Sequence, residues 1–139
     1  MNKYIMEFIG TFFLVLTIGI TANNPSIGQF SPLAISGVLI SMIYIGGPIS
    51  NAHYNPVVTL AIYLSKNCAK KDVPFYILAQ LIGATLAAYI SIYITGSSGT
   101  PNPIALKSII FSEILFTFAL VSVIFTTYQT QPFQLDNFI

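Results

Sequence analysis

The sequence has 139 residues, of which only 6% are charged, and its formal net charge at pH 7 is +1. A typical soluble protein has about 25% charged residues, whereas here no Asp, Glu, Lys or Arg lies between Glu7 and Lys66. This composition excludes an ordinary soluble domain and predicts an integral membrane protein. The near-zero charge gives no indication of nucleic acid as a partner, and the single cysteine excludes an internal disulfide.

The first apolar segment runs from Tyr4 to about Ala22 and follows Lys3. A basic residue before an apolar run is also found in secretory signal peptides. This segment, however, contains Glu7 and has no clear small-residue cleavage site. We therefore expect a retained first transmembrane span.

Three further spans are expected, since a membrane-spanning helix needs roughly 20 residues. The second covers residues 32–48 and ends at a Gly-Gly-Pro cluster, which predicts a helix stop. The third covers residues 74–95, and the fourth covers residues 104–128. A short polar tail, residues 129–139, follows.

Between the second and third spans lies the segment Ser50-Asn51-Ala52-His53-Tyr54-Asn55-Pro56-Val57. The Asn55 side chain is of a type preferred at an N-cap, and Pro56 suits the first helical position, where a missing N–H costs nothing. The apolar run that follows ends at Lys66, so it is about half as long as a span. We expect residues 50–54 to be extended and a half-helix to follow them, an element that forms binding sites in membrane transporters.

The lysines indicate the orientation of the chain. Three of the five, Lys66, Lys70 and Lys71, lie in the loop after the half-helix, and Lys3 precedes the first span. The positive-inside rule then places the N-terminus and this loop in the cytoplasm, with the spans in the inner cell membrane. The half-helix leaves from and returns to the cytoplasmic side, and is therefore expected to be re-entrant.

An internal repeat relates the first and fourth spans. Residues 7–15 can be laid over residues 113–121 with five of nine positions identical, including a glutamate and a threonine. The second copy lies three spans further along the chain than the first, so it runs in the opposite direction. Such an inverted repeat places a binding or permeation site at the interface of the two halves.

These features resemble the major intrinsic protein family, the aquaporins and aquaglyceroporins. The segment 50–60 is similar to the family's first Asn-Pro-Ala box. The Glu-x-x-x-Thr openings at Glu7 and Glu113 are similar to its first and fourth helices, and Gln80 with Gly83 to its third. The resemblance implies an all-α membrane fold, aquaporin-like, with four transmembrane helices, one re-entrant half-helix and a partial inverted repeat.

The sequence departs from the family at Val57, where the box has Ala, and at Asn51, where the family has Gly. The family's fifth helix, second Asn-Pro box and sixth helix have no counterpart, so we expect a truncated product or an incomplete sequence. A single transmembrane domain is expected over residues 1–139. It comprises a first repeat, 1–103, and the first helix of a truncated second repeat, 104–128.

The pore is expected at Asn55, whose amide would point into the lumen at the positive end of the half-helix dipole. Pro56 and Val57 shape the turn beside it. Ile35 matches the second-helix position of the family's outer constriction, with Ser36 the alternative if the alignment shifts by one residue.

Five residues are expected to support the pore structurally: Glu7, Glu113, Thr11, Thr117 and Gln80. The glutamates would be costly facing lipid, and the resemblance implies that they accept hydrogen bonds from the backbone of the re-entrant loop. His53 either faces the lumen or is a hydrogen-bonded structural residue. No metal site is expected, because His53 has no second His, thiolate or carboxylate beside it.

We expect a passive channel for water or small neutral solutes such as glycerol, or an incomplete version of one. The alternative is a non-conducting membrane subunit, or a truncated pseudogene-like product, that packs with another channel half. A proton-coupled transporter using Glu7 and Glu113 is a third possibility. Neither an enzyme activity nor a cofactor is expected. The expected partners are membrane lipid, the solute and, by resemblance, further copies in a homotetramer.

Overall fold

A computed structural model describes residues 2–22, 24, 26–96 and 106–130, and these are helical almost throughout. The long helices are α1 (Asn2–Ala22), α2 (Ser31–Ser50), α4 (Val73–Thr95) and α5 (Leu106–Thr130), with a 3-10 turn, η1 (Gly28–Phe30), before α2 and the short helix α3 (Pro56–Leu64) before α4. Among the described residues, four helices are long and apolar enough to cross a membrane. The predicted all-α membrane fold is therefore confirmed. The expected start of the fourth span at Ile104 and the tail from residue 131 lie outside the described residues.

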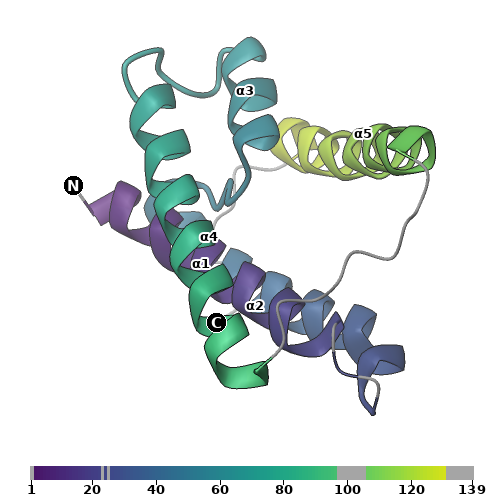
Figure 1. Ribbon diagram of the computed structural model, residues 1–139. Coiled ribbons are helices and arrows are strands. Elements are labelled where there is room, and N and C mark those ends of the chain that lie inside the picture. Colours follow the sequence, from purple (N-terminus) through teal and green to yellow (C-terminus); the bar gives the residue numbers. More distant parts are fainter. Residues whose placement is uncertain (1, 23, 25, 97–105, 131–139) are drawn as a thin grey trace, which may run out of the picture. The chain divides into compact units, whose positions relative to one another are not determined.

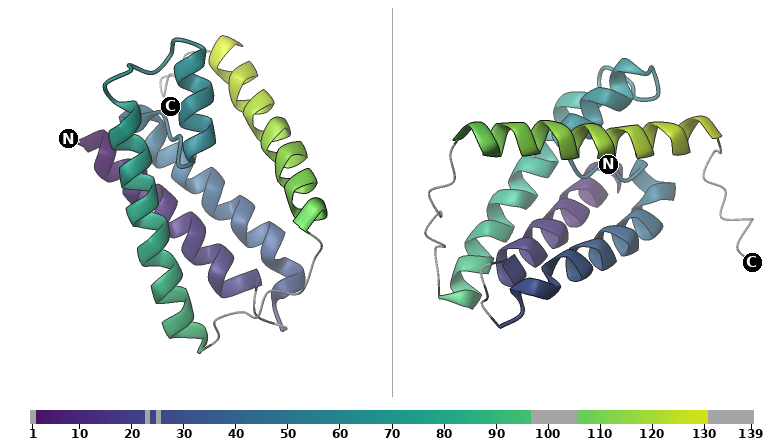
Figure 2. Two further views of the ribbon diagram at one scale, coloured as in Figure 1. Left: turned by 45° about the horizontal axis from the view of Figure 1, so that its top comes forward. Right: turned by 90° about the vertical axis from the view of Figure 1, so that its right-hand side faces the viewer.

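The chain divides into two units, residues 1–99 with α1 to α4 and residues 100–139 with α5. In the first unit α1 lies between α2 and α4, and α3 packs against α4 (Figures 1 and 2). The face of α4 that meets α1 includes Gly83, where an added Cβ would lie 2.6 Å from the Phe8 carbonyl oxygen. The two backbones approach this closely because the position has no side chain, as is usual between membrane helices.

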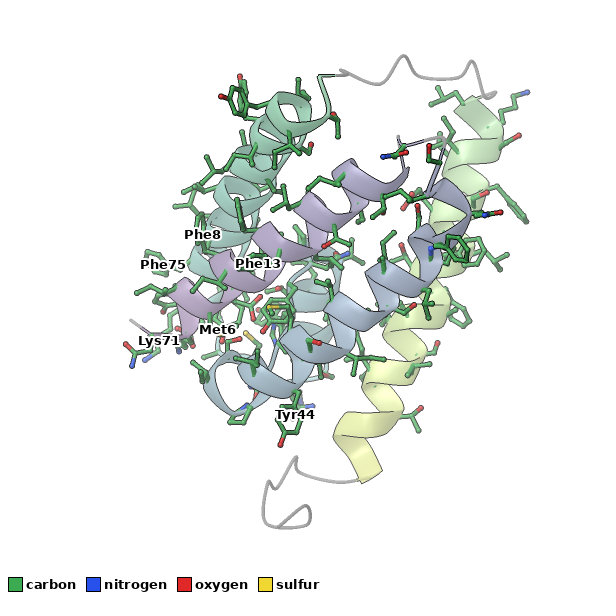
Figure 3. All side chains as sticks on the ribbon, turned by 90° about the horizontal axis from the view of Figure 1, so that it is seen from below. Met6, Phe8, Phe13, Tyr44, Lys71 and Phe75 are labelled. Atoms are coloured by element: carbon green, nitrogen blue, oxygen red, sulfur yellow. The ribbon has the colours of Figure 1, made fainter. Side chains whose placement is uncertain are left out.

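Contact between α1 and α2 is made partly through a third segment. The ring of Tyr54, from the loop after α2, lies against Gly10 of α1 and Gly46 of α2, and a Cβ at either glycine would overlap it. Its hydroxyl donates a hydrogen bond to the Met42 carbonyl at 2.8 Å. Met6 is buried beside this ring, between α1 and α2 (Figure 3). Tyr54 therefore acts as a wedge with a matching gap on each helix.

The predicted end of the second span is wrong. Instead of stopping at the Gly-Gly-Pro cluster, α2 continues through Pro48 to Ser50. Pro48 lacks the N–H that would bond to the carbonyl of Tyr44, a residue that points away from α1 (Figure 3). Membrane helices tolerate this loss because neighbouring groups compensate, and Asn51 closes the last turn by donating its N–H to the Gly47 carbonyl at 3.0 Å.

A polar cluster ties the start of α1 to the start of α4. Lys3 Nζ lies 2.7 Å from Asp72 Oδ2, and the Tyr4 hydroxyl donates to Asp72 Oδ1 at 2.7 Å. The hydrogen bond from Lys3, followed by that from Tyr4, holds the pKa of the Asp72 carboxyl below its ordinary value. The charged form of Asp72 is therefore favoured in the folded chain.

Gly10→Ala should destabilise the helix bundle by about 1–3 kcal/mol, because the added methyl group overlaps the Tyr54 ring in a packed interior. Gly37→Ala is the matched control: it is also a helical glycine, but an added Cβ there meets nothing within 4 Å. Unfolding in mixed detergent micelles, followed by circular dichroism, measures both variants. Equal stability of the two variants would contradict the Tyr54 wedge.

Asp72→Asn should lower the melting temperature at pH 7 by a few degrees and flatten its dependence on pH. The pKa of Asp72 is lowered in the folded state, so its contribution is complete above its unfolded pKa of about 3.9 and is lost as the pH falls below that value. Thermal unfolding in uncharged detergent between pH 3 and 7 tests this. In a Lys3→Gln background the substitution should have little further effect, and an undiminished effect there would argue against the pairing.

Candidate functional site at the half-helix

The start of α3 has the geometry expected from its sequence. Asn55 is extended, with φ −150° and ψ 131°, and its side-chain oxygen accepts a hydrogen bond from the N–H of Val57 at 2.8 Å. Pro56 occupies the first turn, where no N–H partner is needed. The predicted N-cap and half-helix are therefore confirmed, and α3 is nine residues long.

The NH2 group of the Asn55 side chain remains available to donate a hydrogen bond. Its oxygen caps the helix, while its nitrogen forms no hydrogen bond with the residues that the structure describes. Val58 and Ile62 on α3 are buried, but Val57 on the opposite side is 48% exposed. The amide nitrogen thus lies at the positive end of the helix dipole, beside an apolar open face.

Glu7 of α1 anchors the loop that leads to Asn55, and its side chain is fully buried. Its Oε1 accepts hydrogen bonds from Ser50 Oγ at 2.6 Å and from the N–H of His53 at 3.0 Å. Its Oε2 accepts from the N–H of Tyr54 and from Gln80 Nε2, both at 2.7 Å. Four donors from three parts of the chain therefore converge on one carboxylate, which accepts all of them when it is ionised.

The loop is not extended, contrary to the expectation for residues 50–54. Ser50 belongs to α2, and the φ angles of Asn51, Ala52 and Tyr54 are 65°, 51° and 50°. Left-handed residues curl the backbone so that successive N–H groups face one anion. The donors of His53 and Tyr54 both reach Glu7 in this way, which accounts for a conformation that is unfavourable for residues other than glycine.

A second layer of polar contacts joins the loop to α3 and α4. Gln80 Nε2 donates to Thr59 Oγ1 at 3.0 Å, and His53 Nδ1 lies 3.2 Å from the same oxygen. The His53 ring is 4% exposed and packs against Tyr76 at a centroid distance of 4.9 Å. Within the described part of the chain its Nε2 has no hydrogen-bond partner. Whether His53 lines a lumen remains untested, so that role stays a prediction.

Further contacts hold the two ends of the loop. Thr11 Oγ1 donates to the Tyr54 carbonyl at 3.1 Å, and the Tyr76 hydroxyl donates to the Ser50 carbonyl at 3.0 Å. Sequence reasoning missed Ser50, Thr59 and Tyr76 as members of this network. The available signal was that polar groups inside apolar membrane segments need partners.

One expected site residue of the first unit is not brought to Asn55. Ile35 lies in the second turn of α2, about 22 Å along the helix from its last residue, Ser50. Glu113 and Thr117 belong to α5, in the second unit. Their roles stay predictions. Over the described ranges, no three His, Cys, Asp or Glu side chains are placed to hold a metal ion.

The sequence matches a known protein family over almost its whole length. A family model described as Major intrinsic protein matches residues 1–135. Aquaporin NIP1-1 of Arabidopsis thaliana is 40% identical over 94 residues, which cover 63% of this chain and 32% of that protein. Nodulin-26 of Glycine max is 33% identical over 136 residues, which cover 89% of this chain and 50% of that protein. An aquaglyceroporin of Toxoplasma gondii is 32% identical over 99 residues, which cover 70% of this chain and 38% of that protein.

The chain thus spans between about a third and a half of the length of these curated relatives. No solved structure matches it. The family model nevertheless covers nearly all of the sequence, including the half-helix and the four apolar helices. The resemblance inferred from the sequence is confirmed: this integral membrane chain belongs to the major intrinsic protein family.

Proposed function

We propose that this chain forms the Asn55-containing half of a passive channel for water or small neutral solutes. The observation that carries the proposal is the divided use of the Asn55 amide. Its oxygen caps α3, while its nitrogen makes no hydrogen bond to any described residue. An N–H donor held in this way can bind the oxygen of a passing solute, and the cap keeps the donor from rotating away.

The local electrostatics favour a neutral solute. The N-terminus of a helix carries about half a positive charge, which opposes the passage of cations and protons. The open apolar side of α3 offers few competing polar contacts. Water and small polyols such as glycerol fit this chemistry, and two of the similar proteins bear the names aquaporin and aquaglyceroporin.

We further propose the orientation and assembly. The lysine distribution supports a cytoplasmic N-terminus and a re-entrant α3 in the inner cell membrane. Family membership supports a homo-oligomer, with a tetramer as the specific form. Within this arrangement His53, Val57 and Ile35 are candidates for lining the path.

A second candidate function is a non-conducting membrane subunit that packs with another channel half. The open side of α3 favours it, because exposed apolar residues there can pack against another protein segment. A proton-coupled transporter is less well supported, because four donors engage Glu7 and hold it in a structural role.

Proteoliposomes containing this chain should swell in osmotic stopped-flow faster than bare lipid while remaining tight to protons. Asn55→Asp should return water flux toward the bare-lipid rate, since it keeps the capping oxygen but replaces the NH2 donor with a negative charge. Asn67→Asp, an equal charge change in the exposed loop after α3, is the control and should conduct normally. Swelling no faster than bare lipid would contradict a conducting chain and favour the subunit.

Glu7→Ala should destabilise the chain by more than about 3 kcal/mol, because buried donors left without an acceptor cost roughly 1–3 kcal/mol each. Glu7→Gln should lie between Ala and the native residue, since it keeps one acceptor oxygen. Thr17→Val on the same helix removes only an exposed bond to the Phe13 carbonyl and should be neutral. Detergent unfolding measures all three, and a neutral Glu7→Ala would contradict the anchoring role.

A further inference from the structure

Three lysines, Lys66, Lys70 and Lys71, lie within six residues in the loop between α3 and α4. We refer to these three side chains as the basic surface. All three are exposed, and no salt bridge within 4 Å joins them to the described part of the chain. The pore proposal gives them no role beyond orientation, so their charges remain unassigned.

No nearby acid competes for the basic surface. Asp72, the one acidic residue of the loop, is bonded by Lys3 and Tyr4 at 2.7 Å each and is only 8% exposed. Glu7, the other acid of the first unit, is fully buried under four donors. The Lys3–Asp72 pair thus occupies the loop's own carboxylate, with which Lys71 has a weaker electrostatic interaction but no salt bridge among the described residues.

A groove with both polar and apolar lining adjoins one of these charges, that of Lys66. A cavity of about 360 Å³ is lined by Tyr63, Leu64, Lys66 and Cys68. Leu64, the last residue of α3, is 77% exposed and lines this cavity together with Lys66, so an apolar and a basic side chain share one groove. A small soluble anion would use only the charges, whereas a molecule with a phosphate and a hydrocarbon chain would use both parts.

We propose that the basic surface and the adjoining groove bind the headgroups of anionic phospholipids. The proposal rests on the re-entrant arrangement proposed above, in which the loop joins the half-helix to α4, a helix long and apolar enough to span a membrane, and so lies at the lipid headgroup level. Basic residues next to membrane helices are attracted to anionic leaflets. Here the phosphate lies over the lysines, and the acyl chain runs along Leu64.

Native mass spectrometry of the full chain in uncharged detergent tests this directly. Titration with dioleoyl-phosphatidylglycerol should show lipid adducts at concentrations at least about ten-fold below those needed for dioleoyl-phosphatidylcholine, a modest estimate for three lysines near an anionic lipid. The triple variant Lys66→Gln, Lys70→Gln, Lys71→Gln should lose this preference. The corresponding triple Lys→Arg variant keeps the charge and should retain it.

Lys107→Gln, a charge loss outside the basic surface, serves as the control and should bind phosphatidylglycerol normally. Matching helicity of all variants by circular dichroism establishes that each is folded. Equal binding of the two lipids, or an unchanged preference in the triple Gln variant, would overturn the proposal. Displacement of phosphatidylglycerol by equimolar inorganic phosphate would also overturn it, because the surface would then be a free-anion site.

Discussion

The buried carboxylate of Glu7 is the constraint on which the first unit depends. An ionised group inside a membrane protein is costly unless donors surround it. Ser50, His53, Tyr54 and Gln80 supply those donors from the end of α2, the following loop and α4. The same contacts that satisfy the charge also bring these segments together, so the unusual shape of the loop follows from the electrostatics of one residue.

The position of Asn55 is a consequence of this anchor. The loop curls around Glu7 and delivers Asn55 to the first turn of α3, while Thr59 and Gln80 fasten α3 to α4. The backbone of Asn55 is held by the loop, and its side-chain oxygen is held by the helix cap. Its NH2 donor therefore has little conformational entropy left to lose on binding a solute. In the channel proposed above, selectivity at Asn55 is therefore prepared by contacts behind α3. Most of the polar network contributes by holding Asn55 in place, and His53 is its one member proposed to line the path.

Local signals made some of this structure predictable. Asn55 with Pro56 specified a helix start by capping chemistry alone, and composition specified the spans. Pro48 misled because α2 continues past it to Ser50, whose hydroxyl donates to Glu7 and whose carbonyl accepts from Tyr76, contacts that a short segment does not reveal. Short segments could not reveal the left-handed turn at Asn51 or the hydrogen-bond partners of Glu7. Both depend on contacts between Glu7 and residues that lie 43 or more positions away along the chain.

The Tyr54 wedge has a consequence for how the first unit holds together. Because its ring fills the gap between Gly10 and Gly46, the interface between α1 and α2 is made partly of a residue that belongs to neither helix. The Tyr54 hydroxyl bonds to the Met42 carbonyl of α2, and its N–H bonds to Glu7 of α1. The packing of these two helices and the shape of the loop that leads to Asn55 are therefore a single structural feature, and a change in one is a change in the other.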